Sequence, residues 1–247
     1  MRKGKKGFTL IELMIVIAII AIIAAIAIPG LLSSQRASNE RSASTSLKTL
    51  STAEADFRAN DRDWNHVNDF WTFNVYGLYT MTGTAIAGHA NANNTADPAI
   101  KLIELSVASA DSEGNTAIPA GKTDEGAALS TFAVSSAKAG YWYVALAADQ
   151  SLAGTLEMTY KLQTDTGAPY EMGSVHNTSK FGFLTYPDST SSGKFVFIVN
   201  ENNTVYRSAT SAAIKTTAGT PPGPVNASYL DWPTDANLKS FWAKIDG

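Results

Sequence analysis

An acidic side chain, Glu12, stands inside a long apolar stretch near the start of this 247-residue chain. From Phe8 to Ile28 the only other polar residue is Thr9. A charged side chain in a membrane-spanning helix costs free energy, on the order of 2.5 to 3.5 kcal/mol for a central Asp. A buried acid is tolerated only when it is paired. Glu12 is therefore a candidate functional residue that needs a partner.

The stretch around Glu12 is long enough to cross a bilayer. Its residues 8–28 span about 31 Å as a helix, against a hydrocarbon thickness of roughly 30 Å. A cleaved secretory signal has a shorter apolar core and a small-residue cleavage site, whereas Pro29 and Gly30 follow here. Basic residues before a span favour the cytoplasmic side, so we expect one span with the N-terminus inside. The basic residues are Arg2, Lys3, Lys5 and Lys6.

A second candidate site follows the predicted N-terminal helix. Asp61, Asp63, Asn65 and Asp69 have the 1, 3, 5, 9 spacing of a calcium loop. However, His66 stands where such loops place glycine, and position twelve is Thr72 instead of an acid. The alternative is a polar turn in which Asp and Asn side chains bind nearby backbone groups.

Nothing in the motif content predicts an enzyme or a bound cofactor. His66, His89 and His176 lie in separate polar stretches and are expected to be solvated loop residues. The sequence has no H-E-x-x-H zinc motif, no nucleophile elbow and no dinucleotide-binding glycine pattern. We therefore expect no catalytic, cofactor or metal site.

The composition is that of an acidic chain without disulfides. Four of the 19 Lys and Arg residues precede Phe8, so the remainder has 15 against 22 Asp and Glu, a formal charge of −7. This balance gives no indication of a basic nucleic-acid surface. There is no cysteine, so stability must come from a hydrophobic core.

A second helical segment is predicted over residues 31–58. It carries an apolar stripe at spacings of three and four, which is typical of a helix packed on a domain. A continuous helix over residues 8–58 would be about 77 Å long, although Pro29 removes a backbone donor and can kink or locally open it. The stripe consists of Ala43, Leu47, Leu50, Ala53 and Phe57.

The remaining chain predicts a core and a sheet. Aromatic residues after the helix are expected to be core, with a ligand-binding patch as the alternative; they are Trp64, Phe70, Trp71, Phe73, Tyr76 and Tyr79. Residues 81–140 are expected to form a surface excursion with one strand or short helix at 100–107. Strands are predicted at 141–146, 156–162, 180–186, 194–199 and 204–207, the last two as a hairpin. Thr234 is expected to cap a helix over 235–245 that docks on the sheet through Phe241 and Trp242.

The segment Lys6 to Leu13, KGFTLIEL, with the apolar run and Pro29, resembles the class III signal sequences of type IV pilins and type II secretion pseudopilins. The resemblance covers about residues 2–58. It implies that a prepilin peptidase cuts between Gly7 and Phe8 on the cytoplasmic face and that the new amine of Phe8 is N-methylated. It also implies that Glu12 pairs with the N-terminal amine of a neighbouring subunit.

The fold implied by this resemblance is α+β: a long N-terminal helix packed on a C-terminal antiparallel sheet, with long loops and a short C-terminal helix. Residues 1–7 would be the cleaved leader, 8–30 the transmembrane and filament-core helix, and 31–247 the periplasmic or extracellular globular domain.

The expected function is that of a structural subunit held first in the bacterial inner membrane and then polymerised with copies of itself into a surface pilus. Its other partners would be the prepilin peptidase and the pilus assembly platform, and the filament would serve adhesion, motility or secretion. A secretion pseudopilin, a minor pilin, and a membrane-anchored periplasmic binding module or enzyme are the alternatives.

Overall fold

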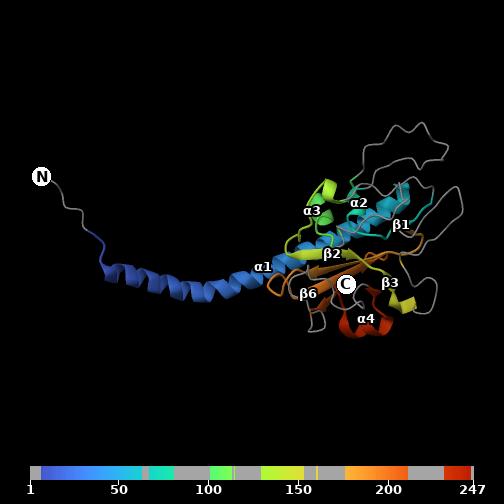
Figure 1. Cartoon of the computed structure of the whole chain (residues 1–247). Helices are drawn as coiled ribbons and strands as arrows, with labels where there is room; N and C mark the ends of the chain where they lie inside the picture. Colours follow the sequence, from blue (N-terminus) through green and yellow to red (C-terminus); the bar gives the residue numbers. More distant parts are fainter. Residues whose placement is uncertain are drawn as a thin grey trace.

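The computed structural model describes residues 7–62, 67–80, 101–112, 114, 129–152, 160, 176–210 and 231–245. It shows a long helix whose second half lies against a β-sheet domain while its first half projects away (Figure 1). Helix α1 runs from Leu10 to Asn60, and Asp61 ends it in the left-handed conformation. The predicted α+β class is confirmed.

Pro29 does not interrupt α1. The helix is continuous through this residue, so the local opening considered from the sequence does not occur. The curvature visible in Figure 1 is gentle and spread along the projecting half. Just after the proline, the hydroxyls of Ser33 and Ser34 donate to the carbonyl of Gly30 at 2.8 and 3.0 Å. These bonds give one carbonyl near the proline additional donors.

The predicted stripe on the second half of α1 is confirmed. Its five residues, Ala43, Leu47, Leu50, Ala53 and Phe57, are all buried. They pack against the main sheet, which α1 contacts along β5, β6 and β7. The stripe therefore attaches the helix to the domain.

The main sheet has five antiparallel strands in the order β2-β5-β6-β7-β9. The strands predicted near 141–146, 180–186 and in the 194–207 hairpin are confirmed, whereas the strand predicted at 156–162 lies outside the described residues except for Tyr160. The five strands are β2 (Tyr141–Ala145), β5 (Gly182–Pro187), β6 (Phe195–Asn200), β7 (Val205–Ala209) and β9 (Ala243–Lys244).

Two short ladders flank this sheet. An antiparallel ladder joins β1 (Phe70–Trp71) to β4 (His176–Asn177). A parallel ladder joins β3 (Ala148–Asp149) to β8 (Asp231–Trp232), with η2 (Gln150–Leu152) directly after β3. Each ladder joins segments that are far apart in the sequence.

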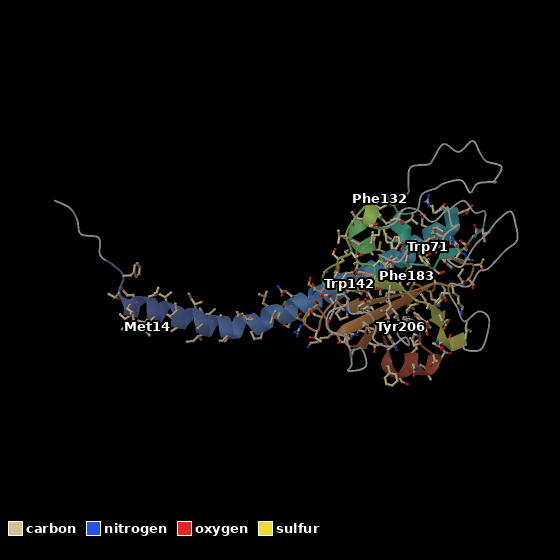
Figure 2. The ribbon with its side chains drawn as sticks, viewed as in Figure 1. Met14, Trp71, Phe132, Trp142, Phe183 and Tyr206 are labelled. Carbon is tan, nitrogen blue, oxygen red and sulfur yellow. The ribbon has the colours of Figure 1, made fainter. Side chains whose placement is uncertain are left out.

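Side-chain alternation gives the sheet two apolar faces, because successive residues of a strand point to opposite sides. The first face meets α1 and includes Tyr143, Phe183 and Phe197. The second includes Trp142, Val144, Leu184, Val196 and Ile198, and it also packs Trp232 of β8. The sheet is thus the middle layer between α1 and the C-terminal segment (Figure 2).

The C-terminal helix is shorter than expected. Helix α4 runs from Asp235 to Phe241, and the predicted Thr234 cap is confirmed by a 3.3 Å bond from the Asn237 N–H. The chain then forms β9 instead of continuing as helix. Leu238 and Trp242 pack on the second face of the sheet. The docking predicted for Phe241 is wrong, because this side chain is 69% exposed.

Part of the predicted surface excursion belongs to the core. Ile103, Val107, Ala110 and Leu129 are buried with the α1 stripe. Residues 81–100, 113 and 115–128 of the excursion lie outside the described residues. The helices here are α2 (Gly77–Thr80), α3 (Leu105–Ala108) and η1 (Leu129–Thr131). The predicted aromatic core is confirmed for Phe70, Trp71 and Tyr76, whereas Trp64 also lies outside the described residues.

Gly77 should be sensitive to the addition of a single methyl group. A Cβ atom there would overlap the indole ring of Trp71, whose Nε1 is fixed by a 2.9 Å bond to the Asn74 carbonyl. We expect Gly77→Ala to lower the free energy of unfolding by about 1–3 kcal/mol, measured by urea denaturation of the full chain in detergent. Gly30→Ala is the control, since open space surrounds that position. Equal stability of the two variants would contradict the prediction.

Candidate functional site

The first half of α1 is apolar and uncovered. Large apolar side chains from Phe8 to Leu32 are between 44% and 91% exposed. Figure 2 shows them, with Met14 labelled, on a helix that projects from the domain. Within the described part of the chain, α1 is the one helix long and apolar enough to cross a membrane. This surface requires a lipid or protein environment.

Thr9 holds the carboxylate of Glu12 at the start of α1. The Thr9 N–H and hydroxyl donate to Glu12 Oε2 at 2.8 and 2.7 Å, and the Glu12 N–H donates to the Thr9 hydroxyl at 3.3 Å. This reciprocal capping box satisfies two N–H groups of the first helical turn. Sequence reasoning missed Thr9 as a partner, although the Thr-x-x-Glu spacing is the sequence signature of this motif.

Gly7 and Phe8 precede the helix and are open to contact. Residues 7–9 are non-helical, Phe8 is 91% exposed, and no atom lies within 4 Å of a Cβ built on Gly7. A hydrolase that cuts this bond would find accessible, non-helical backbone instead of hydrogen-bonded helix. The basic residues predicted to set the orientation lie outside the described residues.

The site is therefore one helix terminus. The structure brings Thr9 and Glu12 into contact just after the Gly7–Phe8 bond, while Pro29 lies far along the same helix and takes no part in the cap. Cutting before Phe8 would create an amine at this terminus. A positive charge would then stand close in sequence to the Glu12 carboxylate.

The projecting half of α1 is attached to the domain by a clasp, defined as the contacts of Arg36, Asn39 and Glu40 with the turn between β5 and β6. Arg36 Nε donates to the Ser191 carbonyl at 3.1 Å and Asn39 Nδ2 to the Ser192 carbonyl at 3.0 Å. Glu40 Oε1 accepts the Lys194 N–H at 2.8 Å. Because these hydrogen bonds reach Ser191, Ser192 and Lys194 of one turn, they restrict the angle at which the helix leaves the domain.

A buried ionisable cluster, formed by Glu54, Asp69 and His176, lies under the second half of α1. All three side chains are fully buried. Glu54 Oε2 accepts the Trp71 N–H at 3.0 Å, and His176 Nδ1 lies 3.4 Å from Asp69 Oδ1. Burial, with a smaller contribution from Asp69, raises the pKa of Glu54 well above its ordinary value.

The histidine prediction is wrong for His176, which stacks on Phe57 and meets the edge of Trp71. His66 and His89 lie outside the described residues. His176 reaches the core because it pairs with Trp71 in the β1–β4 ladder. No signal in its polar sequence neighbourhood indicates that long-range pairing.

The two described aspartates of the calcium-loop candidate, Asp61 and Asp69, have roles in the fold. Asp61 is the C-cap residue of α1 and Asp69 belongs to the buried ionisable cluster, whereas Asp63, Asn65 and His66 lie outside the described residues. Among the residues that the structure describes, no group of three or more His, Cys, Asp or Glu side chains is arranged to hold a metal ion.

Comparison with known proteins identifies the N-terminal segment. Residues 2–28 match the prokaryotic N-terminal methylation motif. In this segment the chain is similar to type IV pilins. A region of 94 residues in this chain is 37% identical to the type IV major pilin protein PilA of Myxococcus xanthus (strain DK1622). That match covers 37% of this chain and 43% of PilA, which is less than half the length of the relative. No solved structure matches this chain.

The methylation motif and the similarity to PilA support a pilin-like subunit. The uncovered apolar half of α1 fits both a membrane-anchored form and an assembled form of such a subunit.

Proposed function

We propose that the chain is a structural subunit of a type IV pilus-like extracellular filament, polymerised through the first half of α1. The observation that carries this proposal is the division of one 51-residue helix into a half buried by its own domain and an apolar half that no described residue covers. A monomer in water rarely exposes so large an apolar surface. The membrane covers it in the stored subunit, and the same helices of neighbouring copies cover it in the filament.

Processing occurs at the Gly7–Phe8 bond in this proposal. Residues 1–7 are the leader that prepilin peptidase removes on the cytoplasmic face, and the new amine of Phe8 is methylated. Residues 8–30 then serve as the membrane span and filament core, and 31–247 lie outside the inner membrane. Support comes from the methylation motif over residues 2–28 and from the open backbone at Gly7.

Glu12 recruits the amine of a neighbouring Phe8 as the subunit enters the filament through its assembly platform. Its Oε2 is occupied by Thr9, while its Oε1 makes no hydrogen bond to any described residue. An ionised pair inside an apolar bundle is strongly favoured over the same charges left apart. The pair would therefore fix the register in which one helix slides past the next.

A pilus subunit is preferred to a pseudopilin or minor pilin because the relative that is 37% identical over 94 residues is named as a major pilin. The N-terminal motif alone serves all three classes. Subunit abundance in sheared filaments, relative to every other protein present, separates a major subunit from a minor one.

The test is mass spectrometry of the subunit in filaments sheared from the producing bacterium. We expect the first residue to be N-methylated Phe8. Gly7→Val should leave residues 1–7 attached and stop filament formation, because the bulkier residue blocks close approach of the peptidase to the backbone. Gly4→Ala, also in the leader, is the matched control and should be cut normally. Normal cutting of Gly7→Val would contradict the peptidase assignment.

A further inference from the structure

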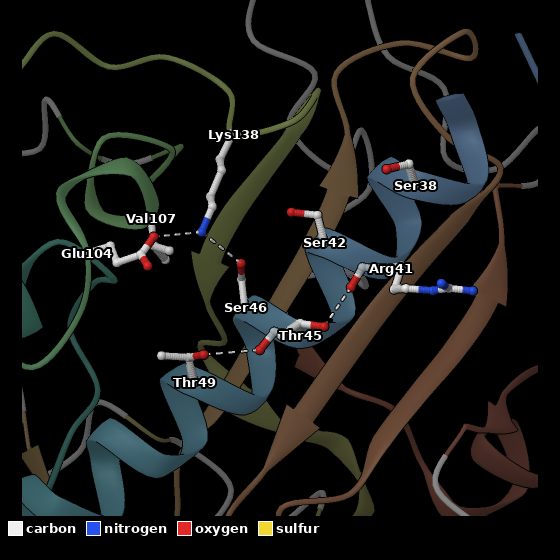
Figure 3. A pocket seen from close by; sticks show the side chains of 9 residues that line it. All are labelled: Ser38, Arg41, Ser42, Thr45, Ser46, Thr49, Glu104, Val107 and Lys138. Carbon is white, nitrogen blue, oxygen red and sulfur yellow. Dashed lines mark hydrogen bonds and ion pairs between the residues drawn. The ribbon is translucent and has the colours of Figure 1, made fainter. Parts of the chain in front are cut away.

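A groove of about 340 Å³ runs along the second half of α1. One side is a helix face that carries Ser38, Ser42 and Thr45, and the other is formed by Glu104 and Lys138. Figure 3 shows Lys138 reaching toward the helix, whereas Arg41, which also lines the groove, points away from Lys138. The groove is separate from the helix terminus that carries Glu12.

The charges in this groove are only partly matched within the subunit. Lys138 Nζ donates to Ser46 Oγ and to Glu104 Oε2, both at 3.2 Å, so the inner wall is internally neutralised. The exposed guanidinium of Arg41 makes no ion pair with the residues that the structure describes. Ser38 and Ser42 likewise make no side-chain hydrogen bond to that part of the chain. The helix side of the groove therefore offers the Arg41 cation and the hydroxyls of Ser38 and Ser42 to another molecule.

We propose that the groove receives an acidic surface of a neighbouring copy of this chain, with Arg41 as its anion-binding group. This inference rests on the proposed filament function. The groove begins at Ser38, about 9 Å along the helix from Leu32, the last large exposed apolar residue of the projecting half. When projecting halves pack side by side, the neighbouring chain continues past this face of α1.

Charge and shape both favour such a neighbour. Without residues 1–7 the subunit has 15 basic against 22 acidic residues, and this excess of acidic side chains on a second copy favours a contact with the Arg41 cation. The short Ser and Thr side chains leave the helix backbone accessible to close approach. An Arg–carboxylate contact here would be charge-assisted and directional, and it would orient the domains once the apolar halves have met.

Cysteine protection tests the groove directly, since the chain has no cysteine of its own. Ser42→Cys places one thiol in the groove. Ser240→Cys places the control thiol on exposed α4, on the opposite side of the sheet from α1 (Figure 1). Alkylation by an uncharged maleimide is timed in the detergent-solubilised full chain and in intact filaments. We expect roughly tenfold slower labelling of Ser42→Cys in filaments and less than about twofold slowing at Ser240→Cys, because an interface excludes water.

Three results of this experiment would overturn the inference. Equal rates for Ser42→Cys in filaments and in detergent would mean that nothing covers the groove. Slow labelling already in detergent would assign the groove to another part of the same chain. Equal slowing at both positions would mean general shielding by the filament. If Ser42→Cys forms no filaments, Thr45→Cys, exposed on the same face, takes its place.

The charge is tested with Arg41→Glu and a matched charge reversal, Lys239→Glu on exposed α4. We expect the Arg41→Glu subunit to be cut and methylated normally but to give several-fold fewer sheared filaments, with Lys239→Glu at the wild-type yield. Wild-type yield from Arg41→Glu, or an equal loss from both variants, would overturn the inference. Absence of filaments from the wild-type chain would instead overturn the proposed function.

Discussion

Replacing Glu12 with alanine is expected to abolish surface filaments while the subunit remains in the membrane and is still cut at Phe8. Glu12 has two separable tasks, one seen in the structure and one proposed for the filament. It completes the capping box with Thr9, whose loss costs only about 0.5–2 kcal/mol of helix stability. In the proposed filament it also neutralises the amine of a neighbouring subunit, and an unpaired buried charge costs more, about 3–5 kcal/mol. The second effect is large enough to stop polymerisation.

Glu12→Gln separates these two tasks. The amide oxygen can still accept from the Thr9 N–H and hydroxyl, so the cap persists, but the negative charge is gone. We expect Glu12→Gln to fail in assembly as completely as Glu12→Ala, and Thr9→Ala to reduce assembly only in part. The measurement is electron microscopy of sheared material, with immunoblots of membranes as the loading control. Normal filaments from Glu12→Gln would show that the cap, and not the charge, is what assembly requires.

The second large effect concerns stability and its dependence on pH. Because burial raises the folded-state pKa of Glu54 well above its ordinary value, the protonated form stabilises the fold. That stabilisation is complete below the ordinary carboxyl pKa and is lost as the pH rises through the raised folded-state pKa. Ionised Glu54 would also face Asp69 and leave Oε1 without a buried donor.

Glu54→Gln should remove this loss. We expect the variant to be at least as stable as the wild type at neutral pH and more stable in alkaline buffer, by about 1–3 kcal/mol, the usual cost of an unsatisfied buried polar group. Urea denaturation of the full chain in detergent, repeated from acidic to alkaline pH, measures the difference. If the two proteins weaken in parallel as the pH rises, Glu54 is not the group responsible.

Glu104→Gln is the matched control for this series. A hydrogen bond from Lys138 lowers the pKa of the exposed Glu104 carboxyl. Its contribution therefore has the opposite sign: it is present above the ordinary carboxyl pKa and is lost as the pH falls through the lowered value. Exposure to solvent makes this contribution small. The control variant should follow the wild type throughout the alkaline range.

Features that depend on neighbouring residues were well predicted from the sequence. The stripe from Ala43 to Phe57 has helical spacing, and the hairpin of β6 and β7 joins two short apolar runs through a four-residue polar turn. Thr234 caps α4 as its residue type indicates. The Thr9–Glu12 cap is equally local, and it was missed because the acid was considered only as a charge in an apolar span.

Features that depend on distant residues could not be predicted. His176 stands among polar residues, yet its pairing with Trp71 carries it into the core. Ile103 and Val107 lie in a region predicted to be a surface excursion, yet they complete the core beside α1. Phe241 is apolar but exposed, because the chain leaves α4 there to form β9. In each case the outcome depends on where another segment lies.

The sequence by itself determined the helix terminus and the projecting apolar helix, because a run of apolar residues and a Thr-x-x-Glu cap act through contacts within a few residues. Only the tertiary structure decided that the second half of α1 covers the buried ionisable cluster and borders the polar groove that Arg41 lines. Both features join α1 to segments such as residues 69, 104, 138 and 176. The free energy of those contacts depends on burial and distance in three dimensions, which spacing along the chain does not specify.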